Sequence, residues 1–128
     1  MNKVVLDTNV LVQLLVGNVE EQQKEAIRLF KRAEKAKMML IVLPVVLAES
    51  CFVLNSYYKK SNEEVATTME GLLSVDWLEI EHKEAMRGMW GWYREGRHFV
   101  DSYLLALQKF ENCQITSFDK RLMKKIGI

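Results

Sequence analysis

The sequence predicts a three-layer α/β domain in which helices flank a mainly parallel central sheet. Short apolar runs alternate along the chain with longer segments in which apolar residues recur every three or four positions. The first pattern is typical of strands buried on both faces, and the second of amphipathic helices. One domain over residues 1–128 is expected, because a chain of 128 residues with 49% apolar side chains can bury one core but not two.

Four short segments are predicted as strands, over residues 4–6, 38–43, 77–80 and 113–116. The first is a β-branched run that stops at Asp7, which suits a strand buried in a parallel sheet. The second is closed by Pro44, a residue that fits the first turn of a following helix. Polar residues directly after such strands matter because α/β proteins place their sites at the carboxyl ends of parallel strands.

Helical spacing is found in six segments, over residues 20–37, 44–58, 61–74, 82–94, 99–110 and 119–125. In the first, apolar residues recur three and four positions apart among charges. Ser61, followed by Glu63 and Glu64, offers a cap and first-turn acids for the third. Gly88 and Gly91 interrupt the fourth, so its bounds are the least defined.

Charge and cysteine content narrow the setting in which the protein works. The chain has 18 basic and 17 acidic residues, so its net charge of +1 gives no general attraction to nucleic acids. Cys51 and Cys113 lie in apolar stretches without metal-ligand spacing and are expected to be buried, reduced thiols. Asp7, Asn9 and Gln13 interrupt the apolar N-terminus before it could form a signal sequence or a membrane span. We therefore expect a cytoplasmic protein without a membrane partner.

Four acids stand apart from the remaining, solvent-facing ones: Asp7, Glu49, Asp101 and Asp119. Glu49 has only apolar neighbours three and four positions away, so it is expected to project from the buried stripe of its helix. Asp101 lies at the start of another apolar helix, directly after Val100. A carboxylate in apolar surroundings requires compensation by a cation or by hydrogen bonds.

Each of these carboxylates also has a simpler structural interpretation. Glu49 could be paired with one arginine or with backbone donors, and Asp101 could cap its helix or interact with the helix dipole. Asp7 could open a turn, and Asp119 could cap the last helix. Topology favours a common site instead, because helix N-termini share an edge with the carboxyl ends of parallel strands. All four acids are then expected at the same edge of the sheet.

A cluster of four carboxylates is expected to hold a divalent cation, because like charges at one edge cannot all stay ionised without one. Oxygen ligands alone favour Mg²⁺, with Mn²⁺ as a substitute, over Zn²⁺. The two histidines, His82 and His98, provide no helix-spaced metal pair. A magnesium ion polarises a phosphoryl oxygen and activates water, so the pattern indicates phosphoester hydrolysis.

At these residues the chain resembles the PIN-domain family, and within it the small toxin ribonucleases of the VapC type. The resemblance is carried by residues 4–11, 48–49, 99–106 and 115–120, which contain the four acids in order. It implies a Mg²⁺-dependent endoribonuclease that cleaves single-stranded RNA with metal-activated water, as the toxin of a type II toxin-antitoxin system. Besides single-stranded or structured RNA, it implies two protein partners: a second copy in a homodimer and a cognate antitoxin.

The resemblance also implies a role for each site residue. Asp7 and Asp101 would be the principal metal ligands. Glu49 would help to hold the metal or its water, and Asp119 would complete the cluster. Hydrogen bonds to these ligands are implied for three neighbouring residues, Thr8, Asn9 and Ser117. Many relatives carry an acid three residues before the third aspartate, where this chain has His98, so the number of metal ions stays open.

Residues near the acids are candidates for RNA contact: Arg94, Arg97, His98 and Lys120. Residues 20–37 hold six bases and four acids, and residues 109–128 hold five bases and two acids, although such runs are more often solvated surface. A group of large apolar side chains fits core packing, a protein interface or base stacking: Met86, Met89, Trp90, Trp92 and Tyr93.

A non-catalytic PIN-like module that binds RNA or a protein partner is the main alternative. In such a module the acidic edge would be structural, whereas the intact set of four acids favours catalysis. A phospho-receiver domain needs adjacent acids after the first strand, and a dehalogenase-like phosphatase needs a second aspartate where Asn9 stands. Neither pattern is present, so metal-dependent hydrolysis of RNA is the function that the sequence favours.

Overall fold

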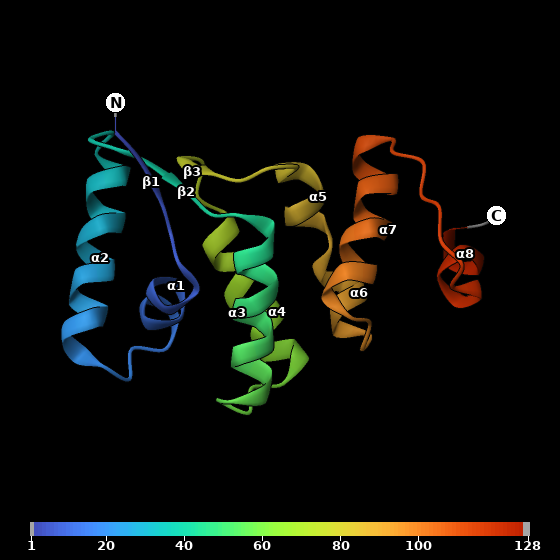
Figure 1. Ribbon diagram of the computed structural model, residues 1–128, viewed down its shortest axis with the longest axis horizontal. Coiled ribbons are helices and arrows are strands. Elements are labelled where there is room, and N and C mark those ends of the chain that lie inside the picture. The colour runs from blue at the N-terminus through green and yellow to red at the C-terminus, as the bar shows by residue number, and fades with distance from the viewer. Residues whose placement is uncertain (1, 127–128) are drawn as a thin grey trace. The chain divides into compact units, whose positions relative to one another are not determined.

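The computed structural model describes residues 2–126 and confirms an α/β fold with a parallel sheet. Three short strands pair in the order β1-β2-β3, over Lys3–Val5, Met39–Ile41 and Leu78–Glu79 (Figure 1). Both pairings are parallel, with Val4 opposite Leu40 and Leu40 opposite Leu78. The predicted strands over residues 4–6, 38–43 and 77–80 are therefore present; the first is shifted by one residue, and the other two are shorter than predicted.

The chain divides into two compact units, Met1–Glu81 and His82–Ile128. The first unit holds the sheet and the helices α1 (Thr8–Leu15), α2 (Glu20–Glu34), α3 (Pro44–Ser56) and α4 (Asn62–Leu73). The second unit holds the helices α5 (Lys83–Gly88), α6 (Trp90–Arg94), α7 (Phe99–Glu111) and α8 (Lys120–Ile126). Within residues 2–126, none of these helices is both long and apolar enough to cross a membrane. A single domain over residues 1–128 stays a prediction.

Most predicted helices are present with small changes at their ends. The helix predicted over residues 61–74 is α4, and its N-terminus is a full capping box. Ser61 Oγ accepts from the Glu64 amide at 3.1 Å, and the Glu64 carboxylate accepts from the Ser61 amide at 3.0 Å. The helix predicted over residues 82–94 is divided into α5 and α6, which meet at Met89.

The prediction differs from the structure in two places. Helix α1 has no predicted counterpart, because residues 10–15 form an almost unbroken apolar run that hides the helical period. The strand predicted over residues 113–116 is absent from the structure. This segment follows Asn112, whose left-handed conformation (φ 55°) ends α7, and it forms no strand ladder within residues 2–126. An apolar, β-branched composition is not sufficient for a strand without a hydrogen-bonded neighbour.

The buried face of the sheet is formed by one alternating set of side chains in the first unit. Val4, Leu40 and Leu78 lie side by side on it, and the two leucines are fully buried. Both crossovers join neighbouring strands in the same direction, so right-handed connections place α1 to α4 on one face. The packing of α1 against both α2 and α3 agrees with this arrangement (Figure 1). Val5, which points to the opposite face, stays 54% exposed.

The core of the second unit is formed by packing of α5 and α6 against α7. Met86, Met89 and Trp90 are buried in it, and Trp90 Nε1 donates a hydrogen bond of 2.8 Å to the Met86 carbonyl. Core packing is therefore the role of most of the large apolar group at residues 86–93. Gly88 permits close approach of the helices, because a Cβ atom at this position would clash with the Phe110 ring.

The two cysteines are free thiols in different surroundings. Cys51 on α3 is 1% exposed, and burial raises the pKa of its thiol to about 12. The expectation that both thiols are buried is wrong for Cys113, which is half-buried. The reason is its place in the irregular segment after α7, where its Sγ lies 3.8 Å from the Glu111 carbonyl oxygen.

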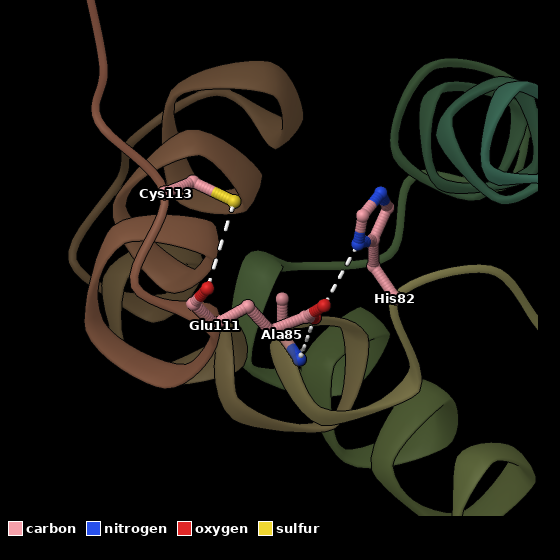
Figure 2. A network of polar contacts seen from close by, with 4 residues as sticks. All are labelled: His82, Ala85, Glu111 and Cys113. Atoms are coloured by element: carbon pink, nitrogen blue, oxygen red, sulfur yellow. Dashed lines mark hydrogen bonds and ion pairs between the residues drawn. The ribbon is translucent and has the colours of Figure 1, made fainter.

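A polar network in the second unit has no counterpart in the sequence predictions (Figure 2). The carboxylate of Glu111, the last residue of α7, accepts a 3.0 Å hydrogen bond from the Ala85 amide in the first turn of α5. Its other oxygen lies 2.7 Å from His82 Nδ1. Burial acts to raise the pKa of Glu111, but the hydrogen bonds from His82 and Ala85 outweigh it and lower the pKa. Glu111 thus caps α5 from a different helix.

Glu111→Gln should lower the melting temperature at neutral pH and have a smaller effect in acid. Because the pKa of Glu111 is lowered in the folded state, its carboxylate stabilises the fold above the unfolded-state pKa. This contribution is lost as the pH falls through the folded-state pKa. Thermal unfolding between about pH 7 and about pH 3 checks the prediction, with the exposed Glu95→Gln as control. The wild-type and Glu111→Gln melting temperatures should converge in acid, and a constant gap between them would contradict the assignment.

Candidate metal-binding site

Asp7 leaves the sheet at the carboxyl end of β1. The Leu6 amide still donates to the Ile41 carbonyl at 3.0 Å, and Asp7 follows as the N-cap residue of α1. Its backbone is extended, and its carbonyl accepts from the amides of Val10 and Leu11. The side chain makes no capping hydrogen bond and is exposed. The turn-opening alternative therefore does not apply, and the carboxylate has no hydrogen-bond partner within residues 2–126.

Glu49 on α3 accepts a short hydrogen bond from the hydroxyl of Thr8, the first residue of α1. Thr8 is buried, so its hydroxyl needs this acceptor. Because Thr8 directly follows Asp7, this hydrogen bond joins the start of α1 to Glu49. No ion pair to an arginine is made by Glu49 within the described residues. The structure thus brings together two of the predicted site residues, Thr8 and Glu49.

The expected position of Glu49 on a buried stripe is wrong. Glu49 is exposed, and its neighbours Val45 and Phe52 are 69% and 67% exposed. The buried face of α3 carries a different set of residues: Leu47, Ser50, Cys51 and Leu54. Helix α3 is apolar around most of its circumference, so its sequence does not show which face is buried.

Asp101 lies in the first turn of α7 and is half-buried. The N-cap residue is His98, and its carbonyl accepts from both the amide and the hydroxyl of Ser102, at 3.0 and 2.9 Å. Asp101 is therefore not the cap of its helix, although a negative charge in this turn is favoured by the helix dipole. Its carboxylate has no hydrogen bond or ion pair within the part of the chain that the structure describes.

Asp119 caps α8, which is the structural alternative that the sequence analysis gave for this residue. Its Oδ1 accepts from the amides of Arg121 and Leu122 at 2.9 and 3.2 Å. The Asp119 amide donates to Ser117 Oγ at 2.9 Å, so the predicted neighbour Ser117 does contact this residue. Its other carboxylate oxygen, Oδ2, takes no part in the cap.

The remaining predicted residues lie near these elements without joining the acids. Asn9 lines a pocket of about 290 Å³ between α1 and α2. Arg94 and Arg97 are half-buried, and Arg97 Nε is buried without a hydrogen-bond partner in the described residues. His98 and Lys120 are exposed. RNA contact by these two residues and by the two arginines stays a prediction.

The chemistry of the four acids fits a hard divalent cation. Asp7 and Asp101 have carboxylates without partners among residues 2–126, and Glu49 and Asp119 each use only one oxygen in the hydrogen bonds described above. Each acid can therefore offer at least one oxygen, the ligand type that Mg²⁺ and Mn²⁺ prefer. Asp7 and Glu49 belong to the first unit, and Asp101 and Asp119 to the second. Within residues 2–126 no three acid, histidine or cysteine side chains form a metal-binding group, so the four-carboxylate cluster stays a prediction.

Substitution of Asp119 should separate its capping role from its charge. Asp119→Ala removes the acceptor of two amides and should destabilise the protein by about 1 kcal/mol. Asp119→Asn keeps an oxygen acceptor, because asparagine is as good an N-cap residue, and should preserve the melting temperature. Thermal unfolding in the presence of chelator measures both. Equal losses in the two variants would show that the charge, and not the cap, stabilises α8.

Comparison with known proteins places the chain in a family. Residues 4–128 match the family model of the PIN domain, and this match runs through both compact units and includes all four acids. A comparison with curated proteins found no match, and neither did one with solved structures. PIN domains are generally nucleases that use divalent metals. Since the match covers nearly its whole length, the chain belongs to the PIN-domain family.

Proposed function

We propose that this protein is a Mg²⁺-dependent endoribonuclease that cleaves single-stranded RNA. Asp7, Glu49, Asp101 and Asp119 would hold the metal, and Mn²⁺ would substitute for Mg²⁺. The observation that carries the proposal is the free carboxylate of Asp7 at the carboxyl end of β1, next to the hydrogen bond between Thr8 and Glu49. Parallel α/β sheets place their sites at this edge, and PIN nucleases bind RNA.

The residues of the first unit prepare the site before any metal binds. The Thr8 hydroxyl donates to one oxygen of Glu49, which fixes the carboxylate and leaves its second oxygen for a metal or a water. Asp7 offers both of its oxygens, because the backbone alone caps α1. When bound, Mg²⁺ would polarise a phosphoryl oxygen and activate water for direct attack on the phosphodiester. Asn9 and Ser117 would assist through hydrogen bonds.

The biological setting is part of the same proposal. The motifs at residues 4–11, 48–49, 99–106 and 115–120 lie within the PIN match and resemble those of the small VapC-type toxins. We infer that it acts in the cytoplasm as the toxin of a type II toxin-antitoxin system, as a homodimer that a cognate antitoxin inhibits. The two free cysteines support a reducing compartment.

The purified protein should cleave an unstructured RNA in the presence of Mg²⁺ or Mn²⁺ and leave 5′-phosphate and 3′-hydroxyl ends. Direct attack by water needs no 2′-hydroxyl nucleophile, so cyclic-phosphate ends are not expected. Asp7→Ala and Glu49→Gln should lower the cleavage rate by orders of magnitude without unfolding the protein. The exposed Glu21→Gln on α2 is the matched control and should stay fully active.

Three results would contradict this mechanism: cyclic-phosphate ends, cleavage that survives chelator, or full activity of Asp7→Ala. Absence of cleavage with any RNA and any metal would instead favour a non-catalytic PIN-like binding module.

Thr8→Val should lower the cleavage rate about 10- to 100-fold, because the substitution removes the donor to Glu49 and keeps the volume of the side chain. Thr8→Ser keeps the hydroxyl and should retain most of the activity. Single-turnover rates, together with the Mg²⁺ concentration for half-maximal activity, measure the effect. Equal activity of Thr8→Val and Thr8→Ser would show that this hydrogen bond does not position Glu49 for the reaction.

A further inference from the structure

Phe118 is the most exposed of the large apolar side chains in the described residues, and its ring is fully open to solvent. It lies between Ser117 and Asp119, in the turn that leads into α8. The backbone around it is held on both sides, because Asp119 donates to Ser117 Oγ and accepts from the first amides of α8. The ring is therefore presented by a defined turn. A fully exposed phenylalanine side chain contributes no hydrophobic stabilisation to the fold, and its apolar surface is available to a partner.

Four cations follow this ring in the seven residues of α8: Lys120, Arg121, Lys124 and Lys125. All four are exposed, and none has an ion pair within residues 2–126. Lys120 and Lys124 are four positions apart, as are Arg121 and Lys125, and like charges at this spacing destabilise a helix. On α2, by contrast, Lys24 and Arg28 have carboxylate partners at 3.2 and 3.0 Å. The charges of α8 are therefore uncompensated within the described chain.

We propose that Phe118 and the cations of α8 bind a single RNA strand, with one unpaired base stacked on the Phe118 ring and phosphates on Lys120 and Arg121. An exposed aromatic ring beside a row of cations suits this ligand, because every base has a π-face and every linkage carries a negative charge. This inference rests on the proposed function, since Asp119 lies next to the ring and would place the stacked nucleotide beside the bond that is cleaved.

The arrangement favours unpaired RNA over other anionic partners. In a duplex the bases are already stacked on their neighbours and cannot cover the ring. A membrane surface would require an apolar face on α8, but Leu122 of this helix is buried in the protein. An acidic peptide could pair with the cations but offers no flat π-surface for the ring. Phe118 thus makes the protein prefer single-stranded to double-stranded RNA. Lys120 and Arg121 supply affinity that does not depend on the RNA sequence.

The test measures RNA binding without cleavage, in chelator, with a labelled unstructured RNA of about 12 nucleotides and a duplex of the same sequence. Phe118→Ala should weaken binding of the single strand about tenfold or more, and leave the duplex affinity and the salt dependence unchanged. Phe118→Trp should preserve binding, and Phe118→Leu should not. Tyr57→Ala is the aromatic control, because this ring is 73% exposed but belongs to the first unit, where Tyr57 is the C-cap residue of α3.

A charge variant tests the second half of the proposal. The double variant Lys120→Ala with Arg121→Ala should reduce the slope of log affinity against log salt by about 0.7 for each phosphate that the protein no longer neutralises. Lys109→Ala removes an exposed cation that lies over the Trp92 and Phe110 rings instead, and should leave the slope unchanged.

An unchanged single-strand affinity in Phe118→Ala, or an equal loss for single strand and duplex, would overturn the stacking role. An unchanged salt slope in the double variant would overturn the binding of phosphates by Lys120 and Arg121. RNA would be the wrong partner if the wild-type protein bound vesicles that contain anionic lipid but did not bind RNA, and if Phe118→Ala and the double variant lost the binding of vesicles. Because binding is measured in chelator, RNA affinity that depends on Phe118 supports this inference even if no metal restores cleavage. Normal cleavage by Phe118→Ala with unchanged affinity would refute this inference alone.

Discussion

The parallel pairing of β1 with β2 is the constraint on which the rest of the first unit depends. Parallel strands cannot be joined by a tight turn, so α1 and α2 must cross from the end of β1 back to the start of β2. The same pairing makes both strands end at one edge, where Asp7 leaves β1 and α3 begins after β2. The hydrogen bond from Thr8 to Glu49 follows from this geometry. In an antiparallel pair the two chain segments would leave at opposite edges, and no such contact could form.

The elements that the sequence predicts well are those whose signals are local. The cap of α4 is specified by Ser61 and Glu64, which lie three positions apart, and the side chain of each accepts a hydrogen bond from the backbone amide of the other. By contrast, α1 is hidden because a short, nearly unbroken apolar run fits a strand and a helix equally well. The segment over residues 113–116 shows the opposite failure. Its composition suits a strand, but a strand is defined by a neighbour that lies far away in the sequence.

For the candidate site, too, the sequence predicted local features better than those that depend on tertiary structure. Chain position was sufficient to predict that Asp7 follows a strand and that Asp101 begins a helix. The contact of Thr8 with a site carboxylate was expected only from the family resemblance. Sequence could not show which oxygens are already used, and Asp119 proves to use one of them in a cap. Nor could it show the face on which Glu49 lies, since an almost entirely apolar helix has no contrast between its faces. The pair of His82 and Glu111 was missed because each residue alone has the appearance of ordinary polar surface.

The two cysteines divide between the two units, one to each, and their unequal environments give them unequal chemistry. A thiol with a pKa of about 12 is almost never a thiolate at neutral pH, and the 1% exposure of Cys51 also shields it from reagents. Cys113, half-buried in an irregular segment, is the more accessible of the two. A maleimide dye would therefore mark the second unit of the native protein without any substitution, and the appearance of a second label would report that the first unit has opened.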